Sequence, residues 1–248
     1  EDVDQVADLK TMKRSCSAIL INNFESFLNF YDSISPKTFN YNGFYLIVVT
    51  SREFLRVEEV FKLIWKKMLY NVDILLQDKN QTGKFSLLTF FPFNQHSCEN
   101  FKPVKINEYS FESQKWKTDV FFPTKLKNLQ SCPLRVGTYE SSPGLIVKKL
   151  NNRSEISGFE GEMFNEIARR LNFSMEIEVV NLINGVSGGI LYANGTADGL
   201  FGRIVNGEFD LIMSLFSAVY LRSVFLTMTR SFYVDKMIIV IPADKLMD

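Results

Sequence analysis

The feature that most constrains the fold is a continuous apolar run at residues 44–49 (FYLIVV), followed by a helical pattern. Such runs of β-branched and aromatic residues are typical of buried parallel strands. Apolar residues then recur at spacings of three and one through residues 57–68, which predicts an amphipathic helix. Strand and helix in alternation predict a doubly wound α/β layer. In this half we expect strands at 17–21, 44–49, 72–76 and 85–91, and helices at 57–68 and at 24–31, the latter capped by Asn22 or Asn23.

The alternation stops between residues 93 and 130 and resumes at residue 134. We expect an irregular linker in this interval, because it holds polar residues, prolines and only scattered aromatic clusters. The sequence therefore predicts a first domain at 1–124, a linker at 125–132 and a second α/β lobe at 133–248. In that lobe we expect strands at 134–137, 174–180, 209–213 and 236–241, a glycine-rich loop from Gly185, and helices at 159–171 (capped by Ser157), 200–206 (closed by Gly207) and 217–224 (capped by Ser217).

Charge and hydropathy narrow the function class. Lys+Arg number 28 and Asp+Glu 28, so the basic excess typical of nucleic-acid binding is absent, and no nucleic-acid partner is expected. The longest apolar runs fall far short of the ~20 residues that a membrane helix needs. The chain starts at Glu1 without a signal-peptide pattern and stops soon after the predicted strand at 236–241. We therefore expect a processed or truncated piece, which meets the membrane only through a missing C-terminal part.

Cysteines and glycosylation motifs point to a secreted chain. Three cysteines without a Cys-x-x-Cys pair exclude zinc-finger and thioredoxin-like motifs. In an oxidising compartment two of the three would pair. Cys98, in a polar loop, is the expected member; its partner is either Cys16 or Cys132, and the remaining thiol is either buried or paired with a missing part of the protein. Asn-x-Ser/Thr motifs predict glycosylation at Asn80, Asn152, Asn172 and Asn194.

The parts of an enzyme are missing from the sequence. The single histidine, His96, lies in a polar loop, and no nucleophile-elbow pattern could pair with it. His-Glu-x-x-His, Walker A and Gly-x-Gly-x-x-Gly motifs are absent, and no two carboxylates are marked as a general acid and base. We therefore expect neither enzymatic activity nor a cofactor nor a bound metal.

An ordered set of short motifs in the second half carries a family resemblance. They are CPLRVG at 132–137, GFEG at 158–161, LNF at 171–173, GEFDLI at 207–212, Arg222 and SFY at 231–233. The set resembles the first extracellular ligand-binding segment of ionotropic glutamate receptors, and more closely the divergent insect ionotropic receptors. FPTKLKNL at 122–129 also looks like the linker of the insect receptors.

The resemblance implies that Arg222 holds the carboxylate of a ligand and that Ser217 touches the same group. A guanidinium fork suits a carboxylate, and amides at a helix start favour an anion. The sequence departs from the amino-acid receptors at three places. Residues 215–219 read LFSAV, where the receptors have Pro-Leu-Thr-x-Thr. Gly144 stands where they have a tyrosine that covers the ligand, and Ala197 where they have a tryptophan. We therefore do not expect glutamate itself as the ligand. We expect a different small acid, an amine or a tastant.

The resemblance also implies the rest of the protein. The second half would be one lobe of a periplasmic-binding-protein-like clamshell, and the first half part of an amino-terminal domain. The second lobe and a pore of three membrane helices would lie outside this sequence. The function implied is that of a ligand-gated cation channel subunit for smell or taste, on the extracellular side of the plasma membrane with co-receptor subunits as partners. There are two alternatives to this function. The chain could be a secreted module that binds a small solute or a partner protein, or a truncated product that associates with intact subunits.

Overall fold

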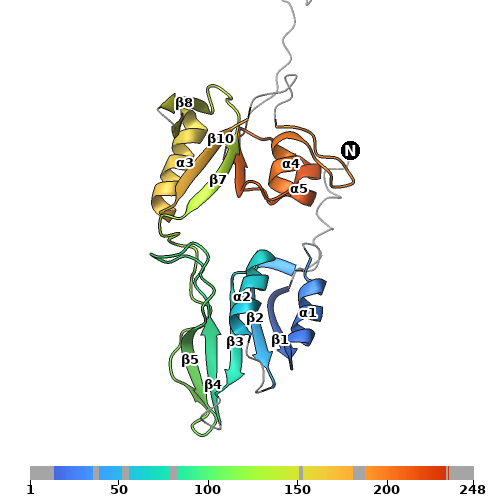
Figure 1. The fold of residues 1–248 in the computed structure, drawn as a ribbon, viewed down its shortest axis with the longest axis vertical. Helices are drawn as coiled ribbons and strands as arrows, with labels where there is room; N and C mark the ends of the chain where they lie inside the picture. The colour runs from blue at the N-terminus through green and yellow to red at the C-terminus, as the bar shows by residue number, and fades with distance from the viewer. Residues whose placement is uncertain are drawn as a thin grey trace, which may run out of the picture. The chain divides into compact units, whose positions relative to one another are not determined.

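The structure is a computed structural model that describes residues 14–35, 39–51, 56–78, 83–150, 153–180, 188–232 and 234. The chain divides into two compact units (Figure 1). Unit 1 holds Glu1–Pro133 and Ala168–Ser174, and unit 2 holds Leu134–Ile167 and Met175–Asp248. Each unit is described by itself below.

Unit 1 is built on one six-stranded sheet in the order β1-β2-β3-β4-β5-β6. The first three strands are parallel and the others join antiparallel. Its elements are β1 (Arg14–Ile21), α1 (Phe24–Ser33), β2 (Phe39–Val49), α2 (Val57–Lys66), β3 (Val72–Gln77), β4 (Lys84–Thr89), β5 (Val104–Ser110) and β6 (Lys115–Trp116).

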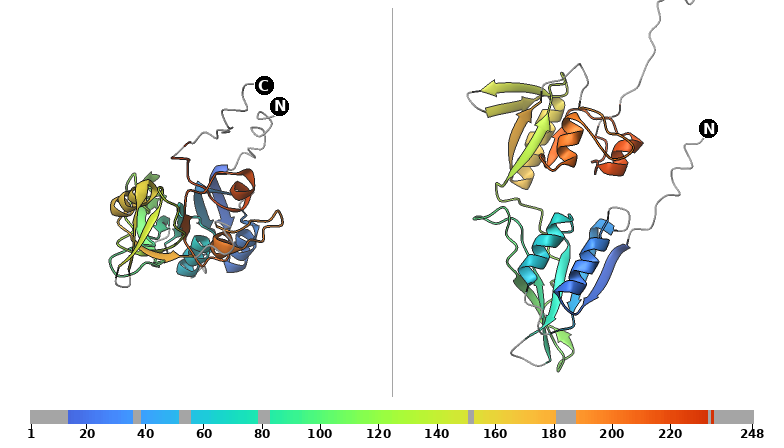
Figure 2. Two further views of the ribbon diagram at one scale, coloured as in Figure 1. Left: turned by 90° about the horizontal axis from the view of Figure 1, so that it is seen from above. Right: turned by 45° about the vertical axis from the view of Figure 1, so that its right-hand side comes forward.

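The core of unit 1 lies between the sheet and its two helices. α1 and α2 touch each other and cover the same face of the sheet, as the two views in Figure 2 show. Side chains of β2 and β3, such as Ile47 and Ile74, meet Phe27 of α1 and Phe61 of α2 there, all fully buried. α1 starts where the sequence predicts, because the Asn23 side chain accepts from Ser26 N and the Ser26 hydroxyl from the Asn23 N–H, a capping box.

Unit 2 carries a smaller sheet in the order β10-β7-β11, beside a two-stranded hairpin. β11 runs parallel to β7, and the bonds from Ser174 N to Cys132 O and from Val180 N to Thr138 O place β10 parallel to it as well. The elements are β7 (Pro133–Thr138), β8 (Ile146–Leu150), β9 (Arg153–Ser157), α3 (Gly158–Leu171), β10 (Ser174–Val179), α4 (Gly199–Val205), β11 (Leu211–Met213) and α5 (Tyr220–Phe225).

The α/β class predicted from the sequence is confirmed, as are the strands that became β1 to β4, β7, β10 and β11. The prediction of an irregular stretch at 93–130 is wrong in part, because β5 and β6 form inside it and extend the sheet. The β8–β9 hairpin was not predicted. Ser157, the expected cap of α3, is the last residue of β9 and directly precedes Gly158, where α3 begins. The strand expected at 236–241 and residues 185–187 of the loop expected from Gly185 lie outside the described residues.

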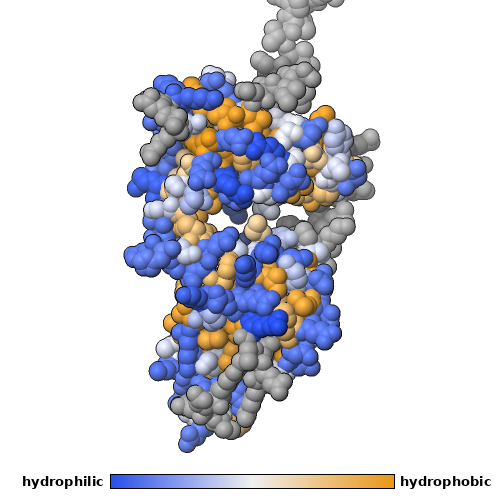
Figure 3. Space-filling model, in the orientation of Figure 1, coloured by the Kyte–Doolittle hydropathy of each residue, from blue (hydrophilic) through white to orange (hydrophobic). Residues whose placement is uncertain are grey.

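Surface hydropathy is uneven in both units. Figure 3 shows hydrophobic side chains reaching the surface of each. Large apolar side chains with high exposure include Leu20 in unit 1 and Tyr220 in unit 2. Within the described residues, no helix is long and apolar enough to cross a bilayer.

Candidate ligand-binding site

The carboxyl ends of β7 and β11 lie side by side and are locked together by side-chain hydrogen bonds. Thr138 Oγ1 donates to Met213 O at 2.7 Å, and Ser214 Oγ donates to Tyr139 O at 2.6 Å. The Tyr139 hydroxyl donates in turn to Ser214 O at 3.2 Å. The strand order reverses around β7, and open α/β sheets bind their ligands at the carboxyl ends of strands at such a point.

Glu160 fixes the backbone that follows β11. It lies in the first turn of α3 with 4% of its surface exposed, and Oε2 accepts from Leu215 N at 2.9 Å. Burial raises the pKa of this carboxyl, and hydrogen bonds from the Leu215 and Ser214 amides counteract the rise. Leu215 has a φ of 52°, in the left-handed region that a branched residue seldom adopts. The buried carboxylate therefore holds the chain in the turn that leads to Ser217.

Leu215 also occupies the space next to Gly144. A Cβ placed on Gly144 would lie 2.3 Å from Leu215 Cδ1, so a side chain there would have to displace the leucine side chain. Gly144 O accepts from Glu160 N at 2.9 Å, so the same loop is tied to the start of α3. The space that a tyrosine side chain at residue 144 would enter is thus occupied by the side chain of Leu215.

The structure brings Arg222 and Ser217 together. Arg222 Nη1 donates to Ser217 O at 2.8 Å and lies 3.3 Å from Ser217 Oγ. The guanidinium stands 4.7 Å from the centre of the Phe201 ring and 5.7 Å from that of Phe216, distances at which cation–π attraction operates. Arg222 is half-buried, and within the described residues no carboxylate lies within ion-pair distance of it.

This arrangement leaves Arg222 equipped for an anion. Both bonds to Ser217 leave from Nη1, whereas a guanidinium carries five N–H donors. Its Nε and Nη2 groups form one edge of the planar fork that matches a carboxylate. The aromatic rings lie beside the guanidinium and do not neutralise its charge.

The prediction that Ser217 caps a helix is wrong. α5 begins at Tyr220 with Val219 at its N-cap, and no side chain caps it. The carbonyl and hydroxyl of Ser217 serve as acceptors for Arg222 instead, which is why the hydroxyl is not turned toward the helix. α5 is six residues long, so its amides add little to an anion site.

Both halves of the chain match models of receptor families. Residues 133–245 match the family described as "Ligated ion channel L-glutamate- and glycine-binding site". Residues 7–128 match the family described as "Putative ionotropic receptor, ligand binding domain". The chain resembles ionotropic-receptor ligand-binding segments in both halves. Both families are described by ligand binding and not by an enzymatic reaction.

Solved structures give a weaker likeness to these receptor segments. The AvGluR1 ligand binding domain in complex with methionine is 20% identical, with a TM-score of 0.32 over 43% of this chain and 38% of that one. The same domain in complex with glutamate is 19% identical, with a TM-score of 0.28 over 40% of this chain and 35% of that one. The chain thus spans less than two fifths of the length of these structures. No curated protein matches it.

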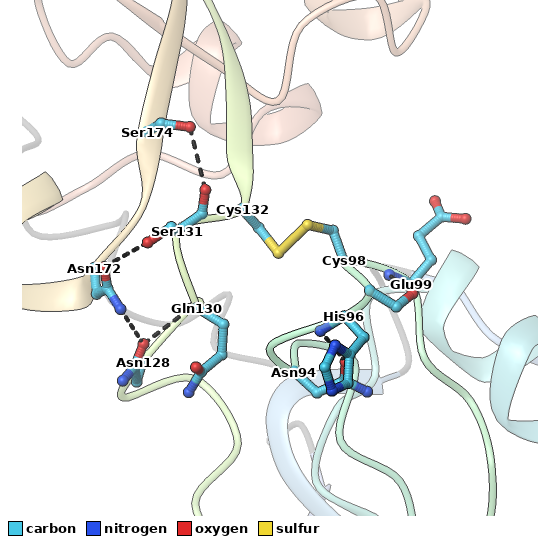
Figure 4. The surroundings of a disulfide bond; sticks show 11 residues. Asn94, His96, Cys98, Glu99, Asn128, Gln130, Ser131, Cys132, Asn172 and Ser174 are labelled. Carbon is cyan, nitrogen blue, oxygen red and sulfur yellow. Dashed lines mark hydrogen bonds between the residues drawn. A yellow bond between two sulfur atoms is a disulfide. The ribbon is translucent and has the colours of Figure 1, made fainter.

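A disulfide joins Cys98 to Cys132 directly before β7, where the two receptor-like halves meet in the sequence (Figure 4). The Cα atoms are 5.5 Å apart. Around it, Ser131 Oγ donates to Asn172 Oδ1 at 3.0 Å, and Asn172 Nδ2 donates to Asn128 Oδ1 at 2.8 Å. Cys16 is exposed and has no disulfide.

The predicted glycosylation sites differ in their surroundings. Asn80 and Asn152 lie outside the described residues. The Asn172 amide is engaged with Ser131 and Asn128, as above. Asn194 is exposed in a turn, and its Oδ1 accepts from Thr196 N at 3.0 Å and Thr196 Oγ1 at 2.7 Å. Glycosylation stays a prediction at all four.

Unit 1 holds a buried acid and a buried base that the sequence analysis missed. Lys125 Nζ donates to Tyr70 O at 2.7 Å and Val72 O at 3.1 Å, and burial lowers the pKa of this amine to about 8 despite the nearby charge of Asp73. Asp73 is fully buried, and its Oδ2 accepts from Phe122 N at 2.8 Å. Burial raises the pKa of this carboxyl. The one available signal was an aspartate inside the apolar strand sequence VDILL.

These polar groups do not form a metal centre. Among the described residues, no group of three or more His, Cys, Asp or Glu side chains could hold a metal ion. The backbone N–H of His96 donates to Asn94 Oδ1 in an exposed turn. The candidate site is therefore the surroundings of Arg222 alone.

Proposed function

We propose that this chain is the extracellular part of a ligand-gated cation channel subunit that serves smell or taste, of the insect ionotropic receptor type. The observation that carries the proposal is Arg222 held against Ser217 at the carboxyl ends of β7 and β11. It lies in the half that matches the L-glutamate- and glycine-binding family. An arginine that is oriented but not ion-paired among the described residues is suited to capture a carboxylate.

The ligand would dock with its carboxylate on the Nε and Nη2 edge of Arg222, and the Ser217 hydroxyl would add a neutral hydrogen bond. Charge-assisted, bidentate bonds of this kind set the orientation of a ligand as well as its affinity. The rest of the ligand would meet a site in which Leu215 fills the space beside Gly144. We therefore propose a small organic acid other than glutamate as the ligand.

The remaining parts of the proposal follow the resemblance. Residues 133–248 would be the first lobe of the ligand-binding clamshell and residues 1–124 a partial amino-terminal domain, joined by the linker at 125–132. A second lobe and a pore would come from sequence outside this chain, and co-receptor subunits would complete the channel at the plasma membrane. The ligand would favour the closed clamshell because it would bind that state more tightly than the open one.

The test replaces Arg222 in the complete receptor. Channels are expressed with co-receptor subunits, and currents are recorded against a panel of small carboxylic acids. Arg222→Lys keeps the charge but loses the fork, so the half-maximal concentration should rise about 10- to 100-fold, as expected for loss of a hydrogen bond to a charged group. The matched control is Arg230→Lys, a change at an exposed arginine of the same segment.

Two results would sink the proposal. One is a dose-response curve for Arg222→Lys that overlays the wild-type curve. The other is a transcript that ends near the codon for Asp248 with no membrane helix beyond it. Such a transcript would favour a secreted binding module, and binding of a small acid by the isolated chain would then be the activity to measure.

A further inference from the structure

Strand β1 has a hydrogen-bonded neighbour on one side only. The sheet order places it last, beside β2, and Figure 1 shows it there in dark blue. In the part of the chain that the structure describes, no strand pairs with its outer edge. An edge of this kind presents unpaired N–H and C=O groups, which can pair with a strand of another chain.

This edge lacks the usual protection against pairing. Natural edge strands are kept short, or carry charged residues or proline. β1 is eight residues long, and after Arg14 at its start, residues 15–21 (SCSAILI) contain neither a charged residue nor a proline. An edge with this composition is suited to pairing.

The sheet face beside this edge is apolar and exposed at β1. α1 and α2 cover one face of the parallel part, and on the opposite face the segment around Phe122 packs on Phe44 of β2 and on the buried Asp73 of β3. Parallel sheets are normally covered on both faces, and here the cover on this second face stops short of β1. On this second face, alternate residues of β1 are exposed, with Leu20 at 73%, and their partners in β2 are exposed or half-buried. The cross-strand pairs on this face are Cys16 with Phe44, Ala18 with Leu46 and Leu20 with Val48.

The exposed cysteine lies on this same strand and face. Cys16 has no disulfide, although Cys98 and Cys132 of the same chain are joined. An exposed, unpaired cysteine in a chain that forms disulfides is available to a cysteine of another molecule. The unpaired edge of β1 and the free thiol of Cys16 therefore point to the same contact with another chain.

We propose that two copies of this chain associate through β1, antiparallel about a two-fold axis at Cys16, and are joined by a Cys16–Cys16 disulfide. A two-fold axis brings a residue beside it against its own equivalent. Opposed residues of antiparallel strands have Cα atoms about 4.5 or 5.5 Å apart. Both separations lie within the roughly 4.4–6.8 Å that a disulfide spans.

The bond forms by thiol–disulfide exchange. The thiolate of one Cys16 attacks the disulfide of oxidised glutathione and releases one glutathione thiol. The second Cys16 thiolate attacks the mixed disulfide and releases the other. Two cysteine thiols thus lose two protons and two electrons, and one glutathione disulfide is reduced to two thiols.

The size of the contact makes the covalent bond necessary. With the axis at Cys16, Arg14 lies opposite Ala18 of the second copy, so about five residues of each strand overlap. At ~3.3 Å per residue this contact covers on the order of 200 Å² per copy. Stable interfaces bury about 800 Å² per partner, so strand pairing without the disulfide is too small to hold a dimer. The dimer should therefore disappear on reduction.

The experiment uses the full 248-residue chain, purified from a secretory host and equilibrated with oxidised and reduced glutathione. Light scattering and non-reducing gels measure the mass, and peptide mapping identifies the linked cysteines. We expect a dimer with a Cys16–Cys16 link that reverts to monomer in dithiothreitol. Cys16→Ser should remain monomeric and keep the Cys98–Cys132 disulfide.

The matched control moves the thiol along the same face. In a Cys16→Ser background, Leu20→Cys presents a highly exposed thiol. With the proposed axis, this thiol lies about eight residues, or ~26 Å, from its equivalent and should not crosslink. Crosslinking of Leu20→Cys as complete as that of the wild type overturns the proposal, because any exposed thiol would then suffice. A Cys16 that stays free or carries only glutathione overturns it too, as does a dimer that survives reduction.

Discussion

Replacing Lys125 by methionine should flatten the pH dependence of the stability of unit 1. Lys125 is 5% exposed, and its amine donates to two backbone carbonyls, those of Tyr70 and Val72. Burial lowers its pKa from 10.5 to about 8, an effect that the charge of Asp73 partly offsets. The unfolded chain has the ordinary value, so folding and proton binding are linked at this residue.

The sign follows from which state binds more protons. Between pH 8 and pH 10.5 the unfolded chain keeps the proton on Lys125 and the folded chain releases it, so stability rises with pH through this window. Below pH 8 both states are protonated, and burial of the charge costs the folded state its full penalty. From pH 7 to pH 9 the linkage amounts to about 1.3 kcal/mol of added stability.

Tryptophan fluorescence isolates this effect from the rest of the molecule. The chain has two tryptophans, Trp65 and Trp116, and both belong to unit 1. Urea unfolding followed by this signal at pH 7 and pH 9 gives the two free energies of unfolding. The wild type should gain about 1.3 kcal/mol more than Lys125→Met over that interval. Asp73→Asn removes the stabilising charge, so it should lower the Lys125 pKa further and move the gain to lower pH.

The control is Lys127→Met, an exposed lysine two residues along. It should keep the wild-type pH dependence, because no buried amine is changed. Parallel pH profiles for wild type and Lys125→Met would refute the reasoning. They would mean that Lys125 reaches water in the folded state.

Three further predictions concern Glu160, Gly144 and the glycosylation sites. Glu160→Ala leaves the Leu215 and Ser214 amides without their acceptor and should cost about 1–3 kcal/mol per amide in hydrogen-exchange protection of that loop, whereas Glu160→Gln should cost less. Gly144→Ala should destabilise unit 2 by about 1–3 kcal/mol in thermal unfolding, because its Cβ meets Leu215 Cδ1, and Leu215→Ala in the same chain should restore most of the loss. Enzymatic deglycosylation of protein from a secretory host should lower its mass, and Asn194→Gln should remove part of that change; equal masses would contradict the extracellular assignment.

Local patterns predict the parts of this fold that local interactions determine. The run at residues 44–49 became β2, and the capping box at Asn23 set the start of α1. The helix predicted to reach Met68 ends at Lys66, because Met68 adopts a φ of 59° and faces solvent. β5 and the β8–β9 hairpin were missed because antiparallel pairing supplies their stability, and their short, polar sequences carry only a weak pattern of their own.

The candidate site divides in the same way. Proximity of Arg222 and Ser217 was implied by the resemblance, and the structure brings the two together. The sequence did not predict that Ser217 would bond to Arg222 and not cap the helix. A serine five residues before an arginine can do either. The support from Glu160 could not be predicted either, since it depends on a left-handed backbone at Leu215, 55 residues further on, and leucine gives no sign of that conformation.

Two departures from the amino-acid receptors reduce to a single structural change. The resemblance places a proline at residue 215 and a tyrosine at residue 144, where this chain has leucine and glycine. Leu215 turns its side chain into the space that any side chain at residue 144 would enter, with 2.3 Å between its Cδ1 and a Cβ there. With the leucine side chain in this place, residue 144 has no room for a side chain of its own. The buried Glu160 carboxylate accepts from the Leu215 amide at 2.9 Å, and this bond keeps the leucine beside Gly144. A proline at residue 215 could neither adopt the φ of 52° nor donate to Glu160, so this turn depends on the replacement of that proline.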